Sequence, residues 1–491
     1  MGFTLVCTLF IIGTIPILFA AVQPWVWSVY SLSMMTVFLI FMWQPCKRRV
    51  LLPGIGVNLM VVLFFAATLV LCLPFPGNIL SHLSPVRFQT LTTARVLIDS
   101  PSAWQTLSYE PRVALAWWVF LLSLCLYFVV VRSLCAERKT LKRIVWVTMG
   151  VALIEALYGL IQALVPTLGV LWVDYIQAYM GDARGTFINR NHFAGFIEMV
   201  WPLALGFTLA QGGWGQGYTL KTIFASERLN RQALQALGIV VLLLALLFSR
   251  SRAGIAGAAI GFLTFVLLAR SGSKGMSRYT WLMLVGIVGM LIIYSMTIGV
   301  GPIADRFLTL GEGDSRLNFW QDSLHIIKDH PFGIGLRNYE KVFPVYNLSN
   351  LSDKMVDHAH NDYLQLLIEA GWIGFVAVLS GFLIFMGKSA YRIKHMNPHK
   401  DPMRFFIAVG AFSGLVSLAF HSFFDFNLQI PANCVYFVTL MAILCSCAWR
   451  SADCANCAEL NKKDAKKLAT DPHGHTQTFS LRAKKSHRFT K

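Results

Sequence analysis

Residues 113–131 read VALAWWVFLLSLCLYFVVV, a run without a charged side chain that lies between Arg112 and Arg132. An α-helix rises 1.5 Å per residue, so roughly 20 apolar residues cross the hydrocarbon core of a bilayer. Such a run is too long and too uniformly apolar for an ordinary helix of a soluble domain. It therefore predicts a helix that spans a membrane.

Similar runs recur along the chain, and together they predict about twelve spans with boundaries good to a few residues. They lie near 3–22, 25–43, 55–73, 113–131, 144–165, 192–210, 236–249, 255–269, 281–299, 372–387, 405–424 and 432–449. The seventh and eighth are short and meet at 249–252, which predicts a tilted or broken hairpin. The first run is followed at once by another span, so we interpret it as an anchor and not as a cleaved signal peptide.

The composition agrees, because 56% hydrophobic and 13% charged residues lie far outside the usage of soluble proteins. The expected fold is an all-α polytopic membrane domain over residues 1–450, with a large, partly helical outer loop at about 300–371. The tail at 451–491 is basic and polar, and we expect it to be disordered. Ten cysteines avoid the long outer loops, and the cluster near 445–457 has intervals atypical of zinc sites, so we predict neither disulfides nor a metal.

The basic residues predict the orientation of the chain. Most of the 42 Lys and Arg residues fall in alternate connecting segments and in the tail. Basic segments near helix ends resist translocation, so these segments and both termini should face the cytoplasm. The net charge of +18 is thus interpreted as a signal for orientation and for contact with anionic membrane lipids, and not for nucleic acid.

Four polar segments fall on the opposite, outer side. They are GDARGTFINRNHFA at 181–194, SRSRAG at 249–254, a helix-like stretch from about 314 to HPFGIG at 330–335, and HAHNDYLQ at 358–365. In the third segment Asp314 or Ser315 can cap a helix whose apolar stripe is Leu317, Trp320, Leu324 and Ile327.

Arginines gather in these segments. Arg184, Arg250, Arg252 and Arg316 all lie on the outer side where helices end. Guanidinium groups keep their charge in partly dry sites and bind phosphate oxygens in pairs, so the cluster would suit a lipid diphosphate. The alternative for any one arginine is a solvated anchor that orients its helix.

Histidine is the natural proton acceptor near neutral pH, and His360 lies beside Asn361 with Gly371 and Gly374 following. His421 and Asp425 are four residues apart and would share a helix face. That pair could orient an imidazole or form a purely structural hydrogen bond.

These segments resemble those of the bacterial O-antigen ligase and O-antigen polymerase superfamily over about 180–375. The ligase histidine pattern has a similar counterpart here, in which nine residues separate His360-Asn361 from Gly371 and two more separate Gly371 from Gly374. The stretch 184–194 resembles the family segment in which Arg and Gly precede Phe-x-Asn-x-Asn. The stretch 251–254 resembles the family's Ser-Arg-small-Gly turn. The stretch 316–335 resembles the start of the family's large periplasmic loop.

The resemblance implies a glycosyltransferase of the bacterial inner membrane whose active site faces the periplasm, without a metal or other cofactor. The donor would be a polyprenyl diphosphate-linked glycan, and the acceptor a hydroxyl of a glycan, of lipid A core or of a protein. His360 would correspond to the essential histidine, and Arg252 and Arg316 to the essential arginines, with Arg250 a close competitor for the role of Arg252. Further residues are expected to bind substrate: Arg184, Asn189, Asn191, Arg250 and Asn361.

Other functions remain open at this point. Polymerases of O-antigen or exopolysaccharide and protein O-oligosaccharyltransferases resemble ligases in these motifs. A transporter would fit the carboxyls of Glu155 and Glu198, which lie within predicted spans. However, we see no clear repeat of halves, and the unusual polar residues gather at the outer boundary and not at the midplane. A scaffold for envelope assembly would explain the hydrophobicity but not the clustering of Arg and His.

Overall fold

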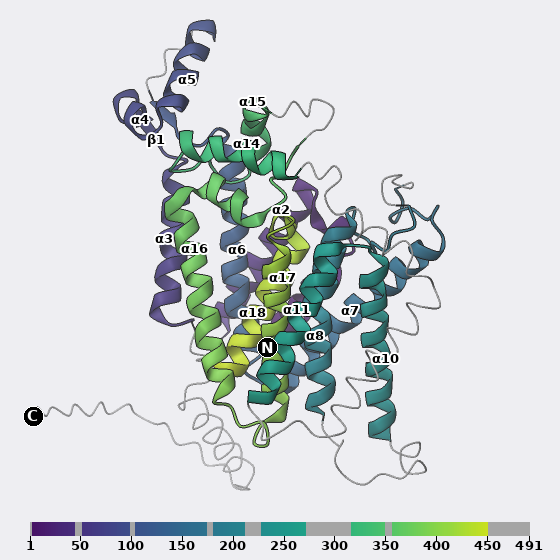
Figure 1. The fold of residues 1–491 in the computed structure, drawn as a ribbon. Coiled ribbons are helices and arrows are strands. Elements are labelled where there is room, and N and C mark those ends of the chain that lie inside the picture. The colour runs from purple at the N-terminus through teal and green to yellow at the C-terminus, as the bar shows by residue number, and fades with distance from the viewer. Residues whose placement is uncertain are drawn as a thin grey trace, which may run out of the picture. The chain divides into compact units, whose positions relative to one another are not determined.

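Long apolar helices dominate the computed structural model, which describes residues 2–44, 52–98, 104–173, 180–211, 227–271, 316–348 and 356–449. Within these ranges, nine helices are long and apolar enough to cross a membrane (Figure 1). They are α2 (Pro24–Trp43), α6 (Pro111–Leu134), α7 (Arg138–Leu164), α8 (Arg190–Ala210), α10 (Glu227–Phe248), α11 (Arg252–Ser271), α16 (Asp362–Lys394), α17 (Pro402–His421) and α18 (Pro431–Ala448). The chain is therefore a multi-pass membrane protein, as its hydrophobic runs predict.

Two further predicted spans form shorter apolar helices, α1 (Gly2–Thr14) and α3 (Ile55–Val70), of 13 and 16 residues. The predicted span at 281–299 and the tail at 451–491 lie outside the described residues. Eleven of the twelve predicted runs thus coincide with apolar helices, while the total of twelve spans stays a prediction.

The remaining elements gather at one end of the helix bundle, which we call the loop end (Figure 1). They are η1 (Phe19–Ala21), β1 (Pro74–Pro76), α4 (Gly77–Leu83), α5 (Pro85–Ile98), β2 (Trp104–Thr106), α14 (Arg316–Asp329), α15 (Tyr339–Tyr346) and η3 (Asn427–Gln429). The strands β1 and β2 pair antiparallel, with Phe75 opposite Gln105. Leu71, Leu80 and Leu107 form a small core beneath α4 and α5.

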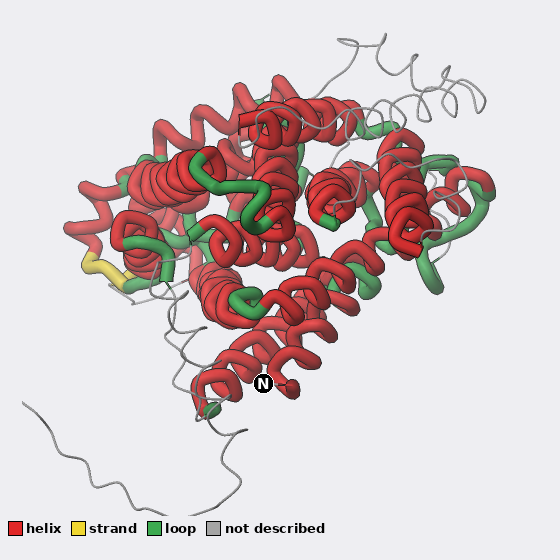
Figure 2. Tube along the Cα trace, turned by 90° about the horizontal axis from the view of Figure 1, so that it is seen from below, coloured by secondary structure: helices red, strands yellow, loops and turns green. Residues whose placement is uncertain are grey.

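The opposite end of the bundle holds the C-terminal ends of α16 and α18. There the indole of Trp449 donates a hydrogen bond to Ser389 over 2.9 Å, and Arg392 lies 5.0 Å above its ring. Figure 2 shows the bundle from below, with its helices packed around one another. Whether this end faces the cytoplasm is a prediction from the basic residues.

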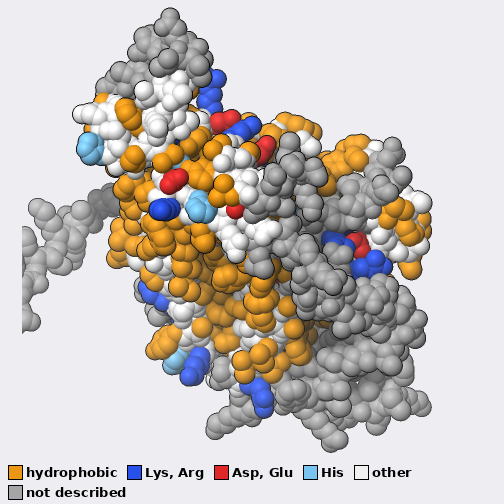
Figure 3. Space-filling model, turned by 45° about the horizontal axis from the view of Figure 1, so that its top comes forward, with side chains coloured by type: hydrophobic (Ala, Val, Ile, Leu, Met, Phe, Trp, Pro, Cys, Tyr) orange, Lys and Arg blue, Asp and Glu red, His pale blue; other side chains and the backbone are white. Residues whose placement is uncertain are grey.

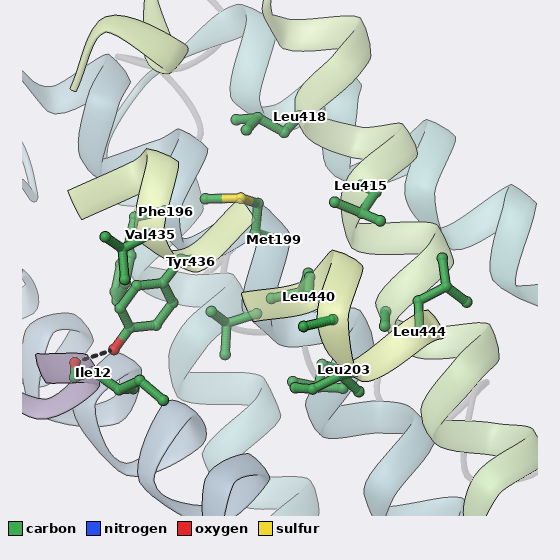
Figure 4. Close-up of a cluster of buried hydrophobic side chains, with 14 of the residues drawn as sticks. Ile12, Phe196, Met199, Leu203, Leu415, Leu418, Val435, Tyr436, Leu440 and Leu444 are labelled. Atoms are coloured by element: carbon green, nitrogen blue, oxygen red, sulfur yellow. Dashed lines mark hydrogen bonds between the residues drawn. The ribbon is translucent and has the colours of Figure 1, made fainter. Parts of the chain in front are cut away.

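The core of the bundle is built on α8 and α17, whose backbones come very close. Gly206, Gly410 and Gly414 each lie against a backbone carbonyl of the other helix, so a side chain at any of them would collide with it. Around this contact Met199, Leu415, Leu440 and other apolar residues fill the interior (Figure 4). Tyr436 of α18 extends the core to the end of α1 by donating to the carbonyl of Ile12 over 2.9 Å. The core of the bundle is therefore closely packed where α8 and α17 meet.

The outer surface of the bundle is an apolar belt, with charged side chains mostly above and below it on the face shown in Figure 3. Large apolar side chains are widely exposed on it, among them Leu32, Val62 and Ile154. A surface of this kind would be an aggregation hazard in water and is typical of contact with lipid.

The predicted helix near 314–327 exists as α14, but its buried face differs from the predicted stripe. Phe319 and Ile326 are buried, Trp320 and Ile327 are partly buried, and Leu324 is 58% exposed. The prediction for Leu324 is wrong, because the face that packs against α15 and α16 is centred on Phe319 and Ile326. Asp314 and Ser315 lie outside the described residues.

Gly371 of the histidine pattern and Gly333 of the HPFGIG segment lie where these two parts of the chain meet. Gly371 breaks the helical backbone of α16 with φ 66°, a conformation that favours glycine. Its backbone there meets Phe332 and Gly333 so closely that a Cβ on either glycine would collide. Ile334 N also donates to Ile368 O over 3.1 Å. The HPFGIG segment is therefore fixed on the kinked first turns of α16, directly after His360.

Candidate active site

His360 lies at the loop end, immediately before α16. Its backbone is left-handed, with φ 50°, and the following Asn361 caps the helix by accepting from Tyr363 N and Leu364 N over 3.1 and 3.0 Å. The imidazole is held by Asp425, whose Oδ1 lies 3.3 Å from His360 Nδ1. About a quarter of the His360 side chain is exposed, whereas Asp425 is buried. The geometry thus exposes an imidazole that a buried carboxylate orients.

The carboxylate of Asp425 remains charged despite its burial. Burial alone would raise the pKa of Asp425, but the neighbouring imidazoles of His192 and His360 lower it well below its usual range. An ionised carboxylate only accepts hydrogen bonds, so in a neutral His360 the proton lies on Nδ1 and Nε2 keeps its lone pair. His360 is therefore prepared to accept a proton at Nε2.

His192, in the first turn of α8, belongs to the same cluster. Its Nε2 lies 3.7 Å from Asp425 Oδ1. The ring of Phe426 contacts His192, His358 and His360, at centroid distances of 4.5, 4.1 and 4.9 Å. We call these residues and Asp425 the histidine cluster.

The third imidazole, His358, is buried in a different way. Its Nδ1 lies 3.0 Å from Gln365 Nε2, which in turn donates to Glu369 over 2.9 Å. Burial lowers the pKa of His358 to about 3, and the positive charge of Arg337 acts in the same direction. His358 therefore stays neutral, and His360 is the more exposed candidate for proton transfer.

The structure does not show the pairing of His421 with Asp425 that their spacing in the sequence suggests. The helix α17 ends at His421, so Asp425 is not one helical turn further along. His421 Nδ1 instead lies 2.9 Å from Glu198 of α8, and both side chains are fully buried. The predicted orientation of an imidazole does occur, but the imidazole that Asp425 orients comes from His360.

A second cluster, the arginine cluster, forms around Asp182 from Arg184, Arg190 and Arg250. Asp182 forms ion pairs with Arg190 and, over 3.3 Å, with Arg250. Burial raises the pKa of Asp182, while the charges of Arg190, Arg250 and Arg184 oppose that shift. Three guanidinium groups thus face one carboxylate, and the cluster keeps a net positive charge.

The loop that carries Arg184 is fixed by a carboxyl from within a span. Glu155 of α7 accepts from both the backbone N and the hydroxyl of Thr186, each over 2.8 Å. Arg184 itself is almost completely buried. Asn189, which we predict to bind substrate, caps α8 by accepting from Asn191 N over 2.8 Å. Glu155 and Asn189 therefore have clear structural roles in holding the arginine-bearing loop.

Arg252 begins α11, two residues after Arg250. Ser251 caps this helix by accepting from Gly254 N over 3.3 Å, and Gly254 packs against Ala194 near the start of α8. Arg252 is partly exposed, and among the described residues it forms no ion pair. The predicted Ser-Arg-Ser-Arg turn therefore joins α10 and α11, with Arg250 paired to Asp182 and Arg252 partly exposed.

The first turn of α14 lies against His360. Phe319 stacks on the His360 ring at a centroid distance of 6.3 Å, and Trp320 donates to Ala359 O over 3.0 Å. Arg316 is the first residue of α14, but its side chain lies outside the described residues. The backbone thus places Arg316 one turn from the residue that stacks on His360.

The loop end therefore brings together the predicted residues His360, Asn361, Arg184, Arg250, Asn189 and Asn191, with His192 linking the two clusters. Sequence reasoning missed His192, Asp182 and the partnership of Asp425 with His360. The sequence could have revealed His192 and Asp182, because both lie inside the arginine-bearing segment 181–194. Within the described residues, no group of three or more His, Cys, Asp or Glu side chains is arranged to hold a metal ion.

A comparison with known protein families matches residues 237–379 to the O-antigen ligase family. The matched stretch contains Arg250, Arg252, Arg316 and His360, while the arginine-bearing loop precedes it and Asp425 follows it. No curated protein matches the chain significantly.

Proposed function

Through residues 237–379 this chain belongs to the O-antigen ligase superfamily, and we propose that it transfers or polymerises glycan from a polyprenyl diphosphate-linked donor onto a hydroxyl acceptor. The family match supports a membrane protein that ligates or polymerises glycans. We further propose that the loop end faces the periplasm of a bacterial inner membrane. This orientation rests on the distribution of basic residues.

The observation that carries the proposal is the pairing of His360 with Asp425. His360 Nε2 takes the proton of the acceptor hydroxyl, and the resulting oxygen nucleophile attacks the anomeric carbon of the donor sugar. A glycosidic bond forms as the bond between that carbon and the diphosphate oxygen breaks, and the diphosphate leaves with the electron pair. Such a direct displacement inverts the anomeric centre, and we propose that it needs no metal.

The arginines supply the positive charge that this reaction requires. The arginine cluster around Asp182 keeps a net positive charge near the histidine cluster, and it would bind the donor diphosphate. Arg252 and Arg316 stabilise the charge that develops on the leaving diphosphate. Asn189, Asn191 and Asn361 help to hold the substrate, and the side chains of Asn189 and Asn361 also cap the starts of α8 and α16.

Two buried carboxyls that would favour a transporter have structural partners instead. Glu155 accepts both hydrogen bonds of Thr186, and Glu198 pairs with His421. Neither therefore needs a transported ion to explain its position in a span. This supports the transferase over the transporter.

The experiment is an analysis of envelope glycans in a strain that lacks the gene, complemented with wild type, His360→Ala or Arg316→Ala. All variants must reach the membrane in equal amounts, and His395→Ala, an exposed histidine at the opposite end of α16, is the matched control. Wild type and His395→Ala should restore long glycan on its acceptor, while lipid-linked donor accumulates with the other two. Equal restoration by all variants would show that His360 and Arg316 are not catalytic.

A further inference from the structure

His360 and Asp425 belong to different parts of the helix bundle. His360 directly precedes α16, whereas Asp425 lies in the connection between α17 and α18. The first of these two helices ends at His421 and the second begins at Pro431, so Asp425 lies outside both. We call residues 422–428 the Asp425 turn. The distance between the two side chains therefore depends on how this turn is fixed to the start of α16.

One side of the Asp425 turn is fixed to α8 and α18. Asn433 of α18 donates through Nδ2 to Asn427 Oδ1 over 3.2 Å and to the carbonyl of His192 over 3.1 Å. Asn427 also lies directly against Gly195 of α8, where a Cβ would collide with the Asn427 side chain. These contacts place the turn relative to α8 and α18, and its position relative to α16 needs further contacts.

Asp362, the first residue of α16, supplies those contacts. Its backbone N donates to two carbonyls of the turn, those of Ser422 and Asp425, over 2.9 and 3.2 Å. Its carboxylate accepts from Leu428 N over 3.0 Å. Asp362 is only 6% exposed, so these hydrogen bonds are largely shielded from water. One buried residue thus contacts both ends of the Asp425 turn and Asp425 itself.

The place of Asp362 in the chain makes it a short link between the two paired side chains. It follows His360 by two residues, and Asn361 between them caps α16 with two hydrogen bonds. The backbone from His360 to Asp362 is therefore held by the start of the helix. Through Asp362 the Asp425 turn is attached to the same short segment that carries the imidazole.

The buried polar face of α16 holds loop backbone in other places too. Asp362, Gln365 and Glu369 are three and four residues apart, so they share one face of the helix, and all three are buried. Gln365 accepts from Ala359 N over 3.2 Å, and Glu369 accepts from Arg337 N over 2.8 Å. Each of the three side chains thus accepts from a backbone N–H of another segment, and Asp362 is the one that holds the Asp425 turn.

We propose that Asp362 is a positioning residue of the transfer reaction, which holds Asp425 in place against His360. The inference rests on the proposed transferase function and adds a residue to it that acts through Asp425. Its side chain is needed as a hydrogen-bond acceptor for Leu428 N. An amide oxygen accepts a hydrogen bond as a carboxylate does, so asparagine should replace Asp362 and alanine should not.

The kinetic test compares wild type, Asp362→Ala and Asp362→Asn in proteoliposomes with a polyprenyl diphosphate-linked glycan and a lipid-anchored glycan acceptor. Asp362→Ala should lower kcat by about 10- to 100-fold with little change in KM, because a small displacement of a reacting group has effects of this size. Asp362→Asn should recover most of the rate. Wild-type kcat in Asp362→Ala, or no recovery with Asp362→Asn, overturns the proposal.

The matched control is Asp401→Ala. It removes the same kind of contact, a carboxylate that accepts from Arg404 N, at the other end of α17. This variant should transfer at the wild-type rate. A loss equal to that of Asp362→Ala would mean that any such change in the bundle slows transfer, and would overturn the specific role of Asp362.

A double substitution separates positioning from a general structural role. If Asp362 acts through Asp425, Asp362→Ala should change kcat little in a protein that already carries Asp425→Asn. Losses that multiply in the double variant would show that the two residues act independently, which overturns the proposal.

Hydrogen–deuterium exchange tests the contact without any substrate. Peptides that cover residues 422–430 should exchange faster in Asp362→Ala than in wild type, because a hydrogen bond to the turn is lost. Exchange there should return toward wild type in Asp362→Asn and stay at the wild-type level in Asp401→Ala. Unchanged exchange in Asp362→Ala overturns the proposal even if transfer is lost. A wild type that transfers nothing overturns the proposed function instead, and the exchange rates still decide whether Asp362 holds the turn.

Discussion

Oδ1 of the buried Asp425 lies 3.3 Å from Nδ1 of His360, although the two residues are 65 positions apart in the chain. The pairing fixes the tautomer of His360, so its loss should affect the reaction more than substrate binding. We expect Asp425→Asn to lower kcat by about 100-fold with a much smaller change in KM, because a misplaced proton disables general-base catalysis. Steady-state transfer assays with the purified protein measure both constants.

The control for this prediction is Asp401→Asn. Asp401 caps α17 at its other end by accepting from Arg404 N, and asparagine caps a helix equally well. Wild-type kcat in the Asp425→Asn protein would contradict the positioning role. A rise in KM alone would instead assign Asp425 to substrate binding.

Substitution of Arg250 and substitution of Arg252 should affect stability and transfer rate differently. Arg250 is tied to Asp182, whereas Arg252 is partly exposed at the start of α11. We expect Arg252→Gln to lower the transfer rate by about 100-fold, because a charge-stabilising donor is lost. Arg250→Gln should lower the thermal midpoint more than Arg252→Gln does, with a smaller effect on the rate. The reverse order of rates would give Arg250 the catalytic role.

The sequence predicts the spans well because a bilayer demands a long apolar run wherever a helix crosses it. The runs at 113–131 and 432–449, for example, coincide with α6 and α18. It predicts α14 but not its buried face, because the side that packs depends on where α15 and α16 lie. The kink at Gly371 explains a motif whose spacing alone gives no reason for the glycine.

The candidate site is predictable only in part, for the same reason. His360 and the arginines stand out because polar side chains are unusual at the ends of apolar runs. Their partners Asp425 and Asp182 do not stand out in the sequence, because they contact His360 and Arg250 only through the packing of segments that are distant along the chain. The pairing of His421 with Glu198 of α8 likewise spans 223 positions, which no local pattern reveals.

His330 predicts a pH dependence of stability. The side chain lies between Ser84, Tyr109 and Tyr346, and burial lowers its pKa to about 4. An unfolded histidine titrates near pH 6.5, so between about pH 6.5 and 4 the unfolded chain binds more protons than the folded chain. The stability that neutral His330 contributes is therefore present above pH 6.5 and is lost as the pH falls toward 4.

Thermal unfolding of wild type and His330→Gln in detergent, measured from pH 8 to pH 4, checks this. The midpoint of the wild type should fall more steeply below about pH 6.5 than that of the variant, which has no titrating group there. Parallel curves over the whole range would mean that His330 does not control this dependence.

Asn361 should matter for stability through its cap. Its side chain accepts from two backbone N–H groups in the first turn of α16, and Asn361→Ala removes both hydrogen bonds. We expect a loss of about 1 kcal/mol in the free energy of unfolding, which Asn361→Asp should largely restore. Denaturant titration compares the three proteins. If Asn361→Asp recovers stability but not transfer, the amide also binds substrate, as the sequence predicts.

The most direct test of the central claim is transfer in proteoliposomes that contain only the purified protein, a polyprenyl diphosphate-linked glycan and a lipid-anchored glycan acceptor. The measured quantity is the rate at which glycan appears on the acceptor as the donor is consumed, for wild type, His360→Ala and His395→Ala. We predict transfer by wild type and His395→Ala at equal rates and a loss of about 100-fold or more with His360→Ala. Transfer by His360→Ala at the wild-type rate would contradict the assignment of His360 as the base.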